Sequence, residues 1–98
     1  MSKIYTIGEL RETLAPVFSA HGVRSAVLFG SYSKGLATER SDVDLLVDSG
    51  LRGLAFFGLL ESVVTALNDV PVDMIDVTQL ERGSLIDREI RKSGVQIC

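Results

Sequence analysis

Apolar residues near the start of the chain recur at the three- and four-residue spacing that is typical of one face of a helix. The stripe consists of Ile7, Leu10, Leu14, Val17 and Phe18. Thr6 and Glu9 have the spacing of a capping box, so we expect the helix to begin after Thr6 and to end at Gly22. Pro16 lies inside the stripe and removes one backbone hydrogen bond, which predicts a kink or a break near Leu14 or Ala15.

Short apolar runs, bounded by glycine or aspartate, predict strands. These runs cover residues 23–29, 43–47 and 72–77. Residues 95–98 have the composition of a further short strand at the edge of the sheet. The segment 31–41 is polar and has room for no more than a short helical turn, so we expect it to be a loop.

A longer apolar segment, residues 54–67, predicts a second helix. One face of it would carry Phe56, Leu60, Val63 and Leu67. Further apolar residues widen this stripe beyond what one sheet face needs, so we expect part of it to cover a partner; they are Phe57, Leu59 and Val64. A third helix should begin after Ser84, run to about Lys92 and end at Gly94.

These elements together predict an α+β fold, with a mixed sheet of the α/β type flanked by helices. The chain has 98 residues, about the size of one small domain, and 46% of them are hydrophobic. We see no repeat, linker or low-complexity tract, so residues 1–98 should form a single domain.

Charge and cysteine content narrow the class of protein. The net charge of -3 gives no basic stripe, so direct nucleic-acid binding is not expected. Cys98 is the only cysteine, which excludes an internal disulfide and a cysteine-based metal cluster and fits a reducing cytoplasm. No apolar run approaches the roughly 18 residues of a membrane span. We therefore expect a cytoplasmic protein without a membrane partner.

The candidate chemistry begins with Gly30 and Ser31, which follow an apolar run, and with Asp42 and Asp44 at the start of the next one. Glycine lets a phosphate approach the backbone, which suits a triphosphate. Aspartates two apart on a strand project to the same side, so Asp42 and Asp44 could share Mg2+. A Gly-Ser pair alone, or two aspartates with this spacing alone, is more often an ordinary turn. The occurrence of both in this order along the chain favours a nucleotide site.

Three further residues bear on this site. Asp73 interrupts the third apolar run and could supply a third carboxylate, whereas Asp76 would face the other side and is better interpreted as capping the next turn. Lys34 could neutralise phosphate or be a solvated surface lysine. A Walker motif is excluded, because Leu36 and Ala37 follow Gly35. His21, the sole histidine, is interpreted as a capping or surface residue.

Residues 27–35 read Val-Leu-Phe-Gly-Ser-Tyr-Ser-Lys-Gly, and residues 41–47 read Ser-Asp-Val-Asp-Leu-Leu-Val. This arrangement, with Asp73 following, resembles the minimal nucleotidyltransferase (MNT) family of the polymerase-beta superfamily, over nearly the whole chain. The resemblance implies that Gly30 and Ser31 bind the triphosphate of the nucleotide, and the charge of Lys34 makes it a third candidate for nucleotide binding. The resemblance also implies that Asp42, Asp44 and Asp73 hold Mg2+, as two ions, with Asp73 the base toward the attacking hydroxyl.

The resemblance further implies a role and a partner. Such proteins are commonly encoded beside a HEPN-type toxin and act as its antitoxin by transferring AMP from ATP to a tyrosine. Two alternatives stay open: an antitoxin that only binds and covers its partner, and transfer to a small molecule with a wall supplied by another chain. The composition also suits a homodimer. The chain has Ser33-Lys34-Gly35 where the family usually has Ala-Arg-Gly, so a single flexible cation replaces a bidentate arginine.

Overall fold

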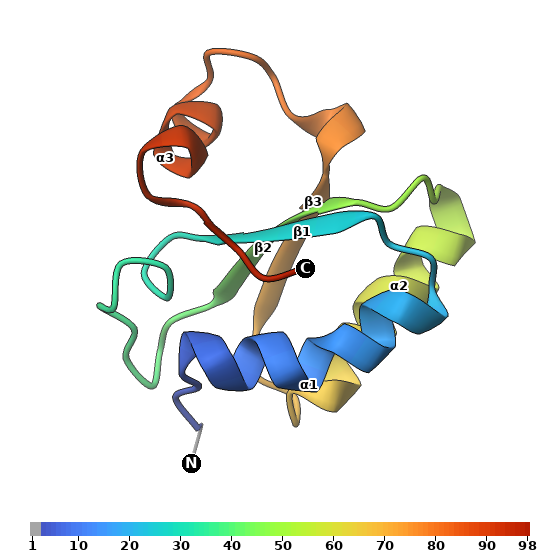
Figure 1. Ribbon diagram of the computed structural model, residues 1–98, viewed down its shortest axis with the longest axis horizontal. Coiled ribbons are helices and arrows are strands. Elements are labelled where there is room, and N and C mark those ends of the chain that lie inside the picture. The colour runs from blue at the N-terminus through green and yellow to red at the C-terminus, as the bar shows by residue number, and fades with distance from the viewer. Residues whose placement is uncertain (1–2) are drawn as a thin grey trace.

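The computed structural model describes residues 3–98. Its elements are, in chain order, α1 (Ile7–Ala20), β1 (Ser25–Phe29), β2 (Val43–Asp48), α2 (Gly53–Ala66), β3 (Val72–Asp76), the 3-10 turn η1 (Val77–Gln79), α3 (Leu85–Ser93) and β4 (Val95–Gln96). The strands form one sheet in the order β3-β2-β1-β4. Helices α1 and α2 lie on one side of this sheet and α3 lies on the other (Figure 1).

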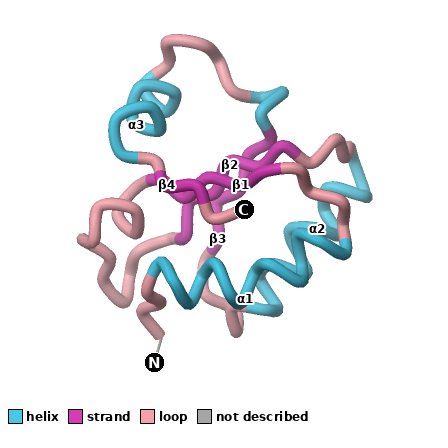
Figure 2. Tube along the Cα trace, viewed as in Figure 1, coloured by secondary structure: helices cyan, strands magenta, loops and turns pink. Residues whose placement is uncertain are grey.

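Strand directions make the sheet mixed, as expected. β1 runs antiparallel to both β2 and β4, whereas β2 and β3 are parallel. A parallel pair needs a crossover connection, and α2 supplies it between β2 and β3 (Figure 2). β4 is a two-residue strand at the edge of the sheet, which confirms the expected edge strand. The α+β fold predicted from the sequence is therefore confirmed.

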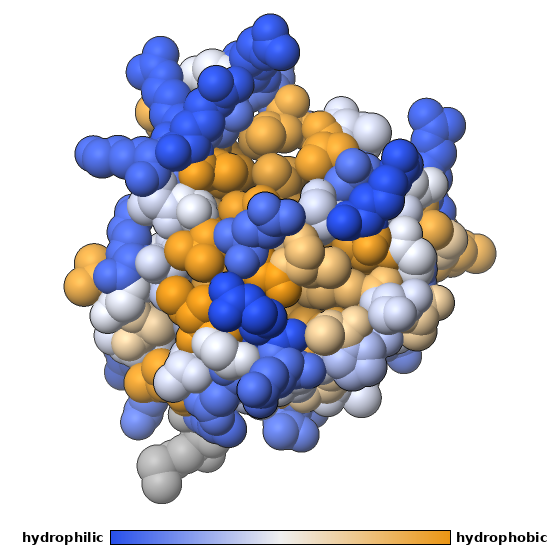
Figure 3. Space-filling model, in the orientation of Figure 1, coloured by the Kyte–Doolittle hydropathy of each residue, from blue (hydrophilic) through white to orange (hydrophobic). Residues whose placement is uncertain are grey.

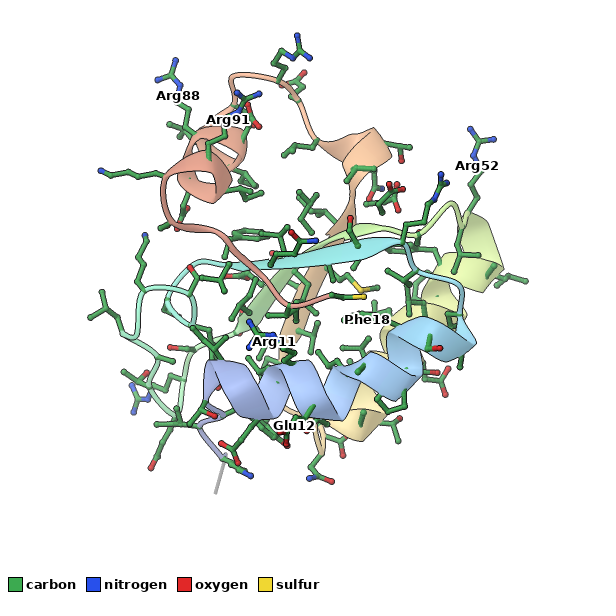
Figure 4. The ribbon with its side chains drawn as sticks, in the orientation of Figure 1. Arg11, Glu12, Phe18, Arg52, Arg88 and Arg91 are labelled. Atoms are coloured by element: carbon green, nitrogen blue, oxygen red, sulfur yellow. The ribbon has the colours of Figure 1, made fainter. Side chains whose placement is uncertain are left out.

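The main core lies between the sheet and the helices α1 and α2. In Figure 4, Phe18 points from α1 into this layer, and it is fully buried. Alternate residues of the central strands point the same way, so Leu28 of β1 and Leu45 of β2 lie opposite each other in register and are both fully buried. The intervening residues of these strands consequently face α3.

Helix α1 begins as its sequence predicts. The Thr6 hydroxyl accepts a hydrogen bond from the Glu9 backbone N–H, and the Glu9 carboxylate accepts one from the Thr6 N–H. Gly22, with a φ of 70°, follows the C-cap residue His21. The expected break near Leu14 or Ala15 is wrong, because α1 continues without interruption through Pro16. Pro16 lies on the exposed side, where water can satisfy the carbonyl that loses its bond.

The other two helices also match their predicted ranges within a residue or two. Ser84 caps α3 by accepting a hydrogen bond from the Asp87 N–H, and Gly94 is the C-cap residue. In α2 the wide apolar stripe divides: Leu59 is fully buried in the core, whereas Phe57 is 67% exposed. Within residues 3–98, no helix combines the length and apolar composition needed to cross a membrane.

Candidate active site

Two of the predicted site residues meet on neighbouring strands. Asp44 of β2 and Asp73 of β3 lie directly opposite each other in the parallel register. Because Val43 and Leu45, on either side of Asp44, are fully buried, the Asp44 carboxylate points to the other face of the sheet. Asp73 shares that face and is exposed. The parallel pairing thus brings together two carboxylates that are separated in the sequence by the whole of α2.

Gly30 lies immediately beside Asp44. It follows Phe29, which pairs in register with Asp44, and it has a φ of 73°. A Cβ atom at this position would collide with Oδ2 of Asp44 and lie 3.2 Å from its Cγ. Glycine therefore serves two purposes here, since it adopts the left-handed backbone and leaves the space that the carboxylate occupies.

The electrostatic environment of Asp44 is strongly negative. Burial is the largest cause that raises the pKa of its carboxyl group to about 6, and the charges of Asp73, Asp42 and Glu89 act in the same direction. Asp42 lies just before β2 and is exposed. Such a group of like charges is unfavourable by itself, and a bound cation would stabilise it.

The segment after Gly30 folds into a compact turn. The Ser33 hydroxyl donates a hydrogen bond to the Gly30 carbonyl at 2.9 Å, and the Leu36 N–H donates to the Ser31 carbonyl at 2.9 Å. Ser31 is half-buried and Lys34 is exposed. This segment contains no helix, so the loop expected over residues 31–41 is confirmed.

Lys34 is not a free surface cation. Its Nζ lies 2.9 Å from Oε1 of Glu89, so the loop is tied to α3 by an ion pair. A hollow of about 490 Å3 adjoins the pair, lined by Lys34, Arg88, Glu89, Lys92 and Ser93. The sequence analysis did not identify Glu89, because it lies in a charged helix with no motif around it. Only the packing of α3 beside β1 reveals its contact with Lys34.

The carboxylates around Asp44 are candidate ligands for a metal ion. Among residues 3–98, no three acidic, histidine or cysteine side chains are gathered closely enough to enclose an ion as they stand. Mg2+ does not need such a cage, because it usually takes one or two carboxylates and completes its shell with water and substrate phosphate. Asp44 and Asp73, paired in register with Asp42 nearby, fit that requirement.

Two residues that the sequence analysis set aside do lie away from the site. Asp76, at the opposite end of β3, caps η1 by accepting hydrogen bonds from the Thr78 N–H and hydroxyl, which confirms its predicted role. His21 is the C-cap residue of α1, and its Nε2 lies 3.1 Å from the Ser62 hydroxyl on α2. Neither belongs to the group around Asp44.

Comparison with known proteins assigns the chain to a family. Residues 12–98 match the family described as polymerase beta, nucleotidyltransferase. Protein adenylyltransferase MntA of Thermococcus cleftensis is 37% identical over 81 residues, covering 74% of this chain and 82% of that protein. A relative from Methanocaldococcus jannaschii is 41% identical over 44 residues, 45% of this chain, and the chain matches about half of that protein's length, 47%.

Solved structures agree on the fold. A complex of the tri-AMPylated Shewanella oneidensis HEPN toxin with MNT antitoxin contains a chain that is 21% identical to this one, with a TM-score of 0.69. The match covers 95% of this chain and 72% of that chain. At this identity the likeness concerns the fold alone. The family match over residues 12–98 and the relative from Thermococcus cleftensis show that the chain belongs to the polymerase-beta nucleotidyltransferase family.

Proposed function

We propose that this protein is a Mg2+-dependent antitoxin that transfers AMP from ATP to a tyrosine hydroxyl of a HEPN-type toxin. The observation that carries the proposal is the pairing of Asp44 with Asp73 beside Gly30, on the face of the sheet that α1 and α2 leave uncovered. The names of its relatives support the acceptor class, since one is a protein adenylyltransferase and another structure holds an AMPylated HEPN toxin.

In the proposed reaction the tyrosine oxygen attacks the α-phosphorus of ATP. A new phosphorus–oxygen bond forms, the bond to the β-phosphate breaks, and pyrophosphate leaves. Asp73, which is exposed, accepts the proton of the hydroxyl on its carboxylate oxygen. Asp42, Asp44 and Asp73 would hold Mg2+, which when bound as two ions neutralises charge on the phosphates and on the attacking and leaving oxygens.

The loop after β1 would hold the triphosphate. Gly30 has no side chain to obstruct the approach of a phosphate, and Ser31 offers its hydroxyl and backbone N–H as donors. Lys34 supplies a single flexible cation in place of the bidentate arginine that is usual at this position. Binding and alignment by these residues convert an encounter between two molecules into an oriented reaction.

The test is to incubate the protein with α-labelled ATP, Mg2+ and the HEPN-type protein encoded beside it. We expect label on the partner with the wild type and at least a hundredfold slower labelling by Asp42→Asn plus Asp44→Asn, because removing both charges removes the cation site. Asp69→Asn plus Glu61→Gln, which removes two exposed charges outside the site, should label at the wild-type rate.

The outcomes separate the proposal from its alternative. Absence of transfer by the wild type, with the two double variants indistinguishable, would refute a catalytic role. If the Asp42→Asn plus Asp44→Asn variant still neutralises the partner when mixed in equal amounts, the protein is an antitoxin that acts by binding. Omitting Mg2+ should abolish labelling by the wild type.

A further inference from the structure

The ion pair between Lys34 and Glu89 joins the candidate nucleotide loop to α3. The two charged atoms lie 2.9 Å apart, and the side chains are 42% and 37% exposed. An exposed pair of this kind contributes little to stability, because water screens both charges. The contact is therefore short but weak enough to be exchanged for another partner.

Glu89 belongs to α3, which lies on the side of the sheet to which the Asp44 carboxylate points. A nucleotide triphosphate at Gly30 and Ser31 would bring further negative charge into the same region. Glu89 thus has a charge of the same sign as the ligand, and it pairs with Lys34, a cation of the loop that follows Gly30 and Ser31.

The outer surface of α3 carries arginine side chains, unlike the side of the helix from which Glu89 reaches Lys34. Figure 4 shows Arg88 and Arg91 pointing away from the sheet, and Figure 3 shows hydrophilic side chains gathered over this helix. Arg91 pairs with Asp87 of its own helix, with Nε 3.2 Å from Oδ1. Among the described residues, Glu89 is the acidic residue of α3 that reaches across to the loop.

We propose that Glu89 competes with the triphosphate of the nucleotide for Lys34, so that Lys34 leaves Glu89 when nucleotide binds and Glu89 sets the nucleotide affinity. The inference rests on the proposed function, since it requires the triphosphate to bind at the loop after β1. Glu89 is a positioning residue in this scheme, because it acts on the ligand through Lys34 and contacts no reacting atom.

The test is a double-mutant cycle on binding of AMP-PNP in the presence of Mg2+. We expect Glu89→Gln to lower the Kd about two- to fivefold, the range that a weak exposed ion pair allows, and Lys34→Ala to raise it. In the Lys34→Ala background, Glu89→Gln should have little effect, because no cation remains to be released.

Glu61→Gln is the matched control, since it removes the same charge from α2, on the opposite face of the sheet, and it should leave the Kd unchanged. Unchanged or weaker binding by Glu89→Gln overturns the competition. An equal gain in the Lys34→Ala background also overturns it, since the effect would then be direct repulsion. If the wild type fails to bind AMP-PNP, the nucleotide proposal fails together with this one; if it binds, only the competition is in question.

Discussion

Gly30 and Gly35 have the same backbone conformation but different surroundings. Their φ values are 73° and 72°, so alanine would be strained by about the same amount at either position. A Cβ at Gly30 collides with Asp44, whereas one at Gly35 meets nothing within 4 Å. We predict that Gly30→Ala abolishes Mg2+-dependent transfer, by more than a hundredfold, because it displaces the Asp44 carboxylate.

Gly35→Ala is the control for this prediction and should lose about 1–2 kcal/mol of stability from backbone strain while retaining most activity. Rates and thermal unfolding of the two variants, measured side by side, separate strain from steric displacement. Equal activity in both would mean that the contact between Gly30 and Asp44 does not matter for catalysis.

The charge of the Asp76 carboxylate makes the stability of the fold depend on pH. Its carboxylate accepts hydrogen bonds from the N–H and hydroxyl groups of both Ser49 and Thr78. Burial by itself raises the pKa of Asp76, but these hydrogen bonds outweigh it and lower the pKa from 3.8 to about 2. The charged form is therefore favoured in the folded chain.

Because the folded pKa is lower than the unfolded one, Asp76 contributes its full stability above pH 4 and loses it as the pH falls toward 2. Asp76→Asn, with a single acceptor oxygen, should lower the free energy of unfolding by about 1–3 kcal/mol at pH 7. Urea denaturation at pH 7 and pH 2.5 measures both effects. The deficit relative to wild type should shrink at the lower pH, and a deficit that grows there would contradict the assignment.

At the scale of elements, the junction between α3 and β4 determines how closely α3 can approach the sheet. A Cβ at Gly94 would lie 2.5 Å from the Ile90 carbonyl oxygen and 2.9 Å from Cγ1 of Val27. We predict that Gly94→Ala destabilises the protein by about 1–3 kcal/mol, because the helix end must move away from β1. Chemical denaturation measures the loss.

Gly58→Ala provides the opposite case within α2, where a Cβ would meet nothing within 4 Å. Alanine should stabilise that helix by about 0.5–1 kcal/mol. A loss at Gly58 comparable to that at Gly94 would show that helix geometry alone, and not contact with β1, governs both positions.

The elements also show what could be predicted from the sequence and what could not. Helix limits were predictable at Thr6, Ser84 and Gly94 because capping depends on neighbours within a few residues. Strand pairing is not local: neither the pairing of β4 with β1 nor the parallel direction of β3 follows from apolar runs. For the same reason Gly30 and Asp44 could be proposed from motif spacing, whereas Glu89 required the packing of α3.

At the scale of the whole molecule, α2 presents apolar residues on two sides. Leu59 is fully buried, while Leu54 and Phe57 are 89% and 67% exposed. We predict that Leu59→Ala lowers the free energy of unfolding by about 2–5 kcal/mol, since it leaves a cavity in the core. Phe57→Ser should change it by less than about 0.5 kcal/mol.

If the exposed side of α2 covers a partner, as its sequence suggested, Phe57→Ser would instead weaken association with the HEPN-type protein. Thermal unfolding of the isolated chain and pull-down with that protein distinguish the two roles. Unchanged association would assign the partner contact to another surface, and a large loss of stability in the isolated chain would contradict the exposed position of Phe57.

The pairing of β2 with β3 has a consequence for misfolding as well as for chemistry. Neighbouring residues of a strand point to opposite faces, so sliding β3 by one residue along β2 would turn Asp73 toward the layer filled by α1 and α2. An unpaired carboxylate in that layer would cost several kcal/mol. The carboxylate that accepts a proton in the proposed reaction would therefore also penalise the mispaired sheet, and replacing it with an apolar residue would remove a barrier to the wrong alignment.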